Sequence, residues 1–201
     1  MEKFTTLDAV AAPLPAPNVD TDQIVPARFL KVPRQSGYGG FLFHDLRFTD
    51  SGLEKPSFVL NQPAYRDARI LVAERNFGCG SSREHAVYCL YDYGFRAVIA
   101  PSFGDIFYGN SFKNGFLPIV LPADTVAALR QEVTDRPGAR VRIDLERQEV
   151  TAPSGAVHHF DIDPFRKQCL LEGVEEIALT LGHADKIAAF EQRQAGELGW
   201  L

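Results

Sequence analysis

The middle of the chain alternates short apolar runs with helix-like segments, and this order most constrains the fold. Apolar and β-branched runs at 68–76, 95–102 and 116–122 have the length and composition of buried strands. Between them, residues 82–94 carry apolar side chains near helical spacing, and both this segment and 103–115 end at a glycine. A strand–helix–strand–helix–strand order predicts a parallel βαβαβ core.

The second half of the chain follows another pattern. Residues 123–138 have the amphipathic pattern of a helix, which ends at a Pro-Gly pair. Residues 139–162 alternate in polarity around a Pro-Ser-Gly turn, which predicts antiparallel strands. Two further helices are expected at roughly 163–172 and 183–195. The sum is a mixed α/β fold with a parallel core and an added antiparallel portion.

Composition excludes several classes of protein. The 201 residues are 45% hydrophobic and 23% charged, which suits a single domain over 1–201 with a helical tail at about 183–201. A net charge of −5 lacks the footprint of a general nucleic-acid binder, and no apolar run is long enough for a membrane span. The N-terminus makes a poor signal peptide, and the three cysteines are too scattered for a disulfide framework. A cytoplasmic location without nucleic-acid or membrane partners is expected.

One long segment, residues 31–57, lacks clear periodicity. A long irregular loop in a compact domain is typically functional or mobile. The same segment is also compatible with a solvated surface loop, so both interpretations stay open.

The stretch NFGCGSSREHA, residues 76–86, is the candidate site. Gly78 and Gly80 follow a predicted strand and allow a tight turn with close approach of a ligand. The helix that follows directs free N–H groups at an anion, and Arg83 adds a planar fork suited to a carboxylate or phosphate. In that field the hydroxyl of Ser81 or Ser82 could act as a general base toward an acidified C–H.

Other readings of the same stretch remain. It contains half of the G-x-G-x-x-G dinucleotide pattern, with Arg83 at the third glycine, so a nucleotide-binding module stays an alternative. Ser81 and Glu84 also fit the S-x-x-E capping box, so Ser81 could serve only to cap a helix. A metal site made by this chain alone is disfavoured, because no C-x-x-C is present and His158 and His159 lie on a predicted strand, where neighbours face opposite sides.

Two long motifs carry a family resemblance. ERNFGCGSSREHA and DYGFRAVIAPSFGDIFYGNSFKNGFLP closely resemble the small subunits of bacterial 3-isopropylmalate dehydratases (isopropylmalate isomerases), which are similar to the swivelling fourth domain of aconitase. NVDTDQIVPARFLK and FDIDPFRKQCLLEGVEEIALTL extend the likeness over about residues 4–195. The resemblance implies an aconitase-domain-4-like swivelling β/β/α domain. It also implies isomerisation of 2- and 3-isopropylmalate by dehydration and rehydration in leucine biosynthesis, with citraconate or homoaconitate as alternative substrates.

The resemblance also assigns roles to residues and a partner. Ser81 would be the base, Arg83 would hold a carboxylate of a dicarboxylate substrate, and Ser82 would contribute at the same anion site. A separate large subunit would carry a 4Fe-4S cluster, whose iron acts as Lewis acid on the leaving hydroxyl, while this chain binds no cofactor or metal itself. Cys79 is then a packing or family-specific residue, not a cluster ligand.

The remaining candidates are less defined. Thr21 and Asp22 resemble a family motif near the large-subunit interface, and they fit equally well as turn or cap residues. Arg34 lies in the stretch 31–40, where the family varies its substrate-recognition loop, so it is either a carboxylate ligand or a solvated charge. Asn110 and Lys113 fall in the second resembling motif without an assigned role.

Overall fold

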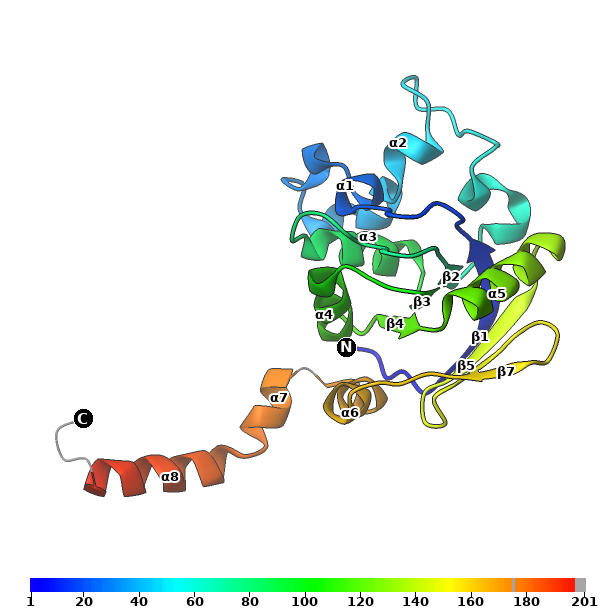
Figure 1. Cartoon of the computed structure of the whole chain (residues 1–201). Coiled ribbons are helices and arrows are strands. Elements are labelled where there is room, and N and C mark those ends of the chain that lie inside the picture. The colour runs from blue at the N-terminus through cyan, green and yellow to red at the C-terminus, as the bar shows by residue number, and fades with distance from the viewer. Residues whose placement is uncertain (175, 198–201) are drawn as a thin grey trace.

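A seven-stranded mixed sheet forms the centre of the protein, in the strand order β4-β3-β2-β1-β5-β6-β7 (Figure 1). The computed structural model describes residues 1–174 and 176–197. The strands are β1 (Thr6–Pro13), β2 (Ile70–Val72), β3 (Ala97–Ala100), β4 (Leu117–Val120), β5 (Arg140–Asp144), β6 (Glu149–Thr151) and β7 (Val157–His159). The helices are α1 (Thr21–Ile24), α2 (His44–Arg47), α3 (Glu84–Tyr93), α4 (Asp105–Lys113), α5 (Ala123–Asp135), α6 (Pro164–Glu172), α7 (Glu176–Leu181) and α8 (Ala184–Glu197).

Strand β1 joins the two halves of the sheet. It pairs in parallel with β2, Ala11 opposite Ile70, and antiparallel with β5, Thr6 opposite Asp144. The predicted parallel core and antiparallel portion are therefore confirmed, and they form one continuous sheet. Strand β1 itself was not predicted, because its inward positions are mostly filled by small alanines and prolines follow it closely.

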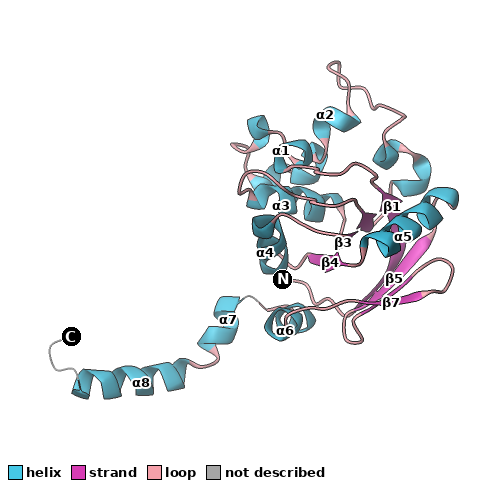
Figure 2. Cartoon of the chain, in the orientation of Figure 1, coloured by secondary structure: helices cyan, strands magenta, loops and turns pink. Residues whose placement is uncertain are grey.

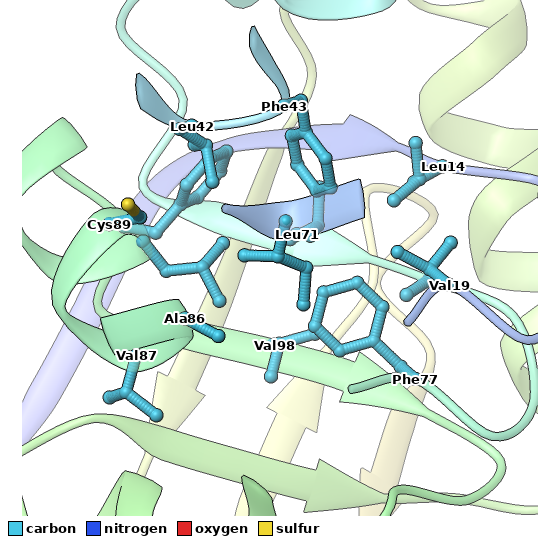
Figure 3. Packing of buried hydrophobic residues seen from close by; sticks show 14 of the residues in the cluster. Leu14, Val19, Leu42, Phe43, Leu71, Phe77, Ala86, Val87, Cys89 and Val98 are labelled. Atoms are coloured by element: carbon cyan, nitrogen blue, oxygen red, sulfur yellow. The ribbon is translucent and has the colours of Figure 1, made fainter. Parts of the chain in front are cut away.

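Helices cover both faces of the parallel half of the sheet. Successive residues of each strand point to opposite faces, so each strand contributes buried side chains to both sides. Leu71 and Val98 face α3 and pack with Ala86 in one buried cluster (Figure 3). Their neighbours Ile70 and Ile99 face the other way, into a second cluster that includes side chains of α4, α5 and α6. Full burial on both faces explains why these strands read as unbroken apolar runs in the sequence.

The helix boundaries differ from expectation in places. The predicted helix at 82–94 begins later, at Glu84, and α7 was not anticipated. Helices α7 and α8 extend away from the sheet, whereas α3, α4 and α5 pack against it (Figure 2). The last four residues of the predicted tail, 198–201, lie outside the described residues. No helix in the described ranges is long and apolar enough to span a bilayer.

The first part of segment 31–57 is folded against the body of the protein and is not a solvated loop. It forms short 3-10 turns and α2, with Tyr38, Leu42 and Phe43 fully or almost fully buried. Gly39 lies so close to α3 that a Cβ there would stand 2.6 Å from the backbone nitrogen of Tyr93. The second part is more open, and the side chain of Leu53 is 68% exposed.

Candidate active site

The glycine-rich loop after β2 lies beside a segment from the beginning of the chain. The N–H of Gly78 donates to the carbonyl of Val19 at 2.7 Å, and the N–H of Thr21 donates to the carbonyl of Cys79 at 2.9 Å. The Thr21 hydroxyl then donates to the carbonyl of Ser81 at 3.0 Å. Thr21 is 2% exposed, so it fixes the backbone that carries Ser81 from inside the protein.

Both glycines of the loop are required by its geometry. Gly78 has φ +72°, and a Cβ there would stand 2.3 Å from Cγ of Phe107, a buried residue of α4. Gly80 has φ +89°, and a Cβ there would meet the Cβ of Asp20 at an ordinary 3.4 Å. A glycine is therefore needed at 78 both for the positive φ and for the close packing against Phe107, whereas at 80 it is needed for the positive φ.

Ser81 and Ser82 lie exposed immediately before α3, and Ser81 does not cap the helix. Arg83 occupies the N-cap position with extended backbone, and the cap makes no side-chain hydrogen bond. The predicted capping box is wrong, since Glu84 instead accepts a hydrogen bond of 2.8 Å from Nδ2 of Asn114. Within the described residues no hydrogen bond engages the Ser81 hydroxyl, so it is available at the amino end of α3 with the unpaired N–H groups of the first turn.

Arg83 points back toward the N-terminal segment, where it pairs with Asp22. Its Nη1 donates to Oδ1 of Asp22, and the side chains are 14% and 54% exposed respectively. An arginine offers five N–H donors, so this contact leaves others free for an incoming carboxylate. The structure therefore brings together Ser81, Ser82 and Arg83 with Thr21 and Asp22.

Arg34 is placed elsewhere. It donates from Nε and Nη2 to the two carboxylate oxygens of Asp92, at 3.1 and 2.7 Å, and its guanidinium lies 4.1 Å from the ring centroid of Tyr88. Asp92 follows Glu84 by eight residues, which is roughly 12 Å along α3. The fork of Arg34 is therefore already filled by the protein's own carboxylate, along the side of α3 and away from its amino end.

Possible metal-binding side chains lie apart from one another in the described residues. In the described part of the chain no three His, Cys, Asp or Glu side chains gather where they could hold a metal ion. Cys79 lies in the glycine-rich loop and Cys89 is buried within α3, where burial raises the pKa of its thiol. An iron–sulfur cluster needs several thiolates together, and these two do not supply them.

The two residues without an assigned role lie on α4. The backbone carbonyl of Asn110 accepts from Nδ2 of Asn114 at 2.9 Å, which links it to the Asn114–Glu84 contact between α4 and α3. Lys113 is exposed at the end of the same helix. Neither side chain is joined to Ser81 by the contacts of the described residues, and sequence reasoning had no signal for Asn114 or Asp92.

Comparisons with known proteins agree with this architecture. Residues 1–124 match the family model of the aconitase C-terminal domain, and residues 127–164 match the model LeuD_N. Residues 176–201 match the model of the C-terminal domain of 3-isopropylmalate dehydratase small subunits. The 3-isopropylmalate dehydratase small subunits of Paramagnetospirillum magneticum and Roseobacter denitrificans are 56% and 54% identical to this chain, over the whole of both chains.

A solved structure shows the same fold. The crystal structure of 3-isopropylmalate dehydratase from Methanocaldococcus jannaschii superposes with a TM-score of 0.63 at 25% identity and covers 94% of this chain and 99% of that one. A family model over more than half of the chain and relatives matched from end to end lead to one conclusion. The chain belongs to the family of 3-isopropylmalate dehydratase small subunits.

Proposed function

We propose that this chain supplies the base and a carboxylate-binding arginine to a two-chain 3-isopropylmalate dehydratase. The reaction interconverts 2- and 3-isopropylmalate by loss and return of water, in leucine biosynthesis. One observation carries the proposal: the unengaged Ser81 hydroxyl stands at the amino end of α3, with Arg83 as the N-cap residue beside it.

The proposed roles follow from where charge develops. Removing a proton from a carbon next to a carboxylate builds negative charge on the substrate. Arg83 and the free N–H groups at the start of α3 oppose that charge, and they also favour the ionised form of Ser81 as it takes the proton. Ser81 returns the proton when water adds back. Ser82, exposed one residue further on, contributes at the same anion site.

Thr21 and Asp22 position these groups. Thr21 holds the carbonyl of Ser81, and Asp22 holds one nitrogen of Arg83 while leaving the rest of the fork open. A 4Fe-4S cluster on the partner large subunit is part of the proposal, and it rests on the likeness to the aconitase family. The proposal further includes a cytoplasmic location and a swivelling movement of this domain against the large subunit, which would close over the exposed serines.

The decisive experiment is reconstitution with a cluster-bearing large subunit, assayed on a panel of 2- and 3-substituted malates. Ser81→Ala should abolish turnover while the subunits still associate in analytical ultracentrifugation. Ser82→Ala is the matched control, because it removes the same hydroxyl one residue away and should retain measurable turnover. Near-normal turnover of Ser81→Ala would remove Ser81 as the base.

A second variant tests the carboxylate site. Arg83→Lys replaces a planar fork by a point charge, so KM should rise more than kcat falls. Unchanged values of both constants would contradict the assignment. A thermal shift with NAD or ATP but none with isopropylmalate, measured on the small subunit, would favour the nucleotide-binding alternative instead.

A further inference from the structure

Two arginines lie side by side at the amino ends of neighbouring strands, at the far end of β2 from Ser81. Arg69 directly precedes β2 and Arg96 directly precedes β3, and the N–H of Arg96 donates to the carbonyl of Arg69 at 2.8 Å. The strands pair in register, Ile70 opposite Ala97, so the two arginines continue that register. Both line one cavity of about 120 Å³.

Like charges on directly opposite strand positions repel each other, and the residues around Arg69 and Arg96 offset this repulsion only in part. The Nε of Arg96 stands 3.5 Å from Oε2 of Glu2, and its Nη1 donates to the carbonyls of Tyr91 and Phe95, both at 2.9 Å. Nε itself is buried without a hydrogen-bond partner in the described part of the protein. A buried donor of a charged group that lacks a partner costs free energy, so the protein itself satisfies the Arg96 guanidinium only in part.

The remaining cations of the cavity are uncommitted. Lys3 lines it together with Arg69, and neither side chain makes an ion pair or hydrogen bond among the described residues. The cavity thus gathers three cationic side chains against the single carboxylate of Glu2, in a chain whose net charge is −5. A local positive excess in an acidic protein marks a place where an anion is attracted.

We propose that this cavity binds a phosphate-sized oxyanion between Arg69, Arg96 and Lys3. The ligand chemistry is that of a tetrahedral oxyanion, supplied either as free inorganic phosphate or as the phosphate group of a small ester. Arginine forks and a lysine ammonium suit the oxygens of such a group. The site is separate from Ser81 and Arg83, which follow the carboxyl end of β2, so the proposal does not depend on the function proposed above.

The test is titration of the full-length small subunit with sodium phosphate at constant ionic strength, followed by calorimetry and by thermal unfolding. Binding should appear as saturable heat and as a rise in Tm that grows with phosphate concentration. Arg69→Gln should weaken the affinity by about tenfold or more, because it removes a charged donor from the anion. Arg69 is exposed, so this variant should fold. Glu2→Gln should bind more tightly, because a competing carboxylate is gone.

Two control variants locate the site. Arg142→Gln removes an exposed arginine from β5, outside the cavity, and should bind phosphate as the unaltered chain does. Arg83→Gln should also leave this affinity unchanged. Glycerol 1-phosphate, added in a separate titration, distinguishes a free phosphate site from one that also accepts an ester.

Three results would overturn the proposal. The first is the absence of saturable phosphate binding to the unaltered chain. The second is equal affinity in Arg69→Gln and Arg142→Gln, which would make the effect one of general charge. The third is loss of binding in Arg83→Gln with full binding in Arg69→Gln, which would assign the anion to the serine-bearing loop.

Discussion

The contact between Gly78 and Phe107 allows a quantitative test of how the serine-bearing loop is held. In Gly78→Ala the new methyl group must sit on a backbone with φ +72° and within 2.3 Å of Cγ of a buried phenylalanine. The left-handed conformation costs an alanine about 1–2 kcal/mol. Overpacking a buried side chain adds about 1–3 kcal/mol, so the total loss of unfolding free energy should be about 2–5 kcal/mol.

Two other glycines separate these contributions. Gly80→Ala has the same kind of backbone, φ +89°, without the clash, and should lose only the conformational part of about 1–2 kcal/mol. Gly40→Ala has open space and no positive φ, and should be neutral or slightly stabilising. The difference between Gly78→Ala and Gly80→Ala therefore measures the packing against Phe107.

The assay is urea unfolding followed by circular dichroism, with thermal unfolding as a second measurement. Each 1 kcal/mol should move Tm by about 2–4 °C in a domain of this size. Equal losses for Gly78→Ala and Gly80→Ala would refute the reasoning, because the clash would then cost nothing. A loss of unfolding free energy in Gly40→Ala as large as in Gly78→Ala would also refute the reasoning, since replacing any glycine would then destabilise the protein equally.

Three further outcomes follow from side-chain contacts. Asp92→Asn should release Arg34 and speed amide hydrogen exchange across residues 34–40 by several-fold. The Tm should change little, because the Arg34–Asp92 pair is partly exposed. Unchanged exchange rates would show that the pair does not hold this segment. Cys89, whose thiol pKa is raised by burial, should resist iodoacetamide in the native protein while the partly exposed Cys79 reacts, as peptide mass spectrometry of the two sites would show; comparable labelling rates would contradict this. The hydrogen bond from Arg28 lowers the pKa of Asp45 to about 2, so the stability that this pair contributes is present above the usual carboxyl pKa near 4 and is lost as pH falls through about 2. Because the pair is exposed, the unfolding free energies of the unaltered chain and Asp45→Asn should differ by under about 1 kcal/mol at neutral pH and should become equal in acid. A difference that grows as pH falls would contradict this prediction.

Most of the parallel half of the fold was predictable from the sequence, because its strands are buried on both faces and its helices end at glycines. Strand β1 was not, since alanines give a weak strand signal and its pairing with β5 is set by residues far along the chain. The family membership and the mixed α/β class are confirmed by the comparisons and the sheet.

The candidate site likewise has a part that the sequence could predict and a part that it could not. The serine, arginine and glycine positions of the candidate site lie within one short stretch, so a local sequence pattern is enough to propose them. The partners of that stretch depend on tertiary contacts: Asp22 reaches Arg83, and Asn114 takes Glu84 away from the predicted capping box. The pairing of Arg34 with Asp92 is likewise invisible in the sequence, because nothing local distinguishes a charge bound by the protein from a free one. The assigned catalytic roles remain predictions.

Strand β1 has a consequence for how the protein is made. It is synthesised before both of its partners in the sheet, since β2 ends at residue 72 and β5 ends at residue 144. One edge of β1 can therefore pair with β2 as soon as residue 72 is made, whereas the other edge stays open until residue 144 completes β5. Such non-local pairing is slow and leaves an open strand edge exposed meanwhile, so early truncation products should be aggregation-prone and dependent on chaperones.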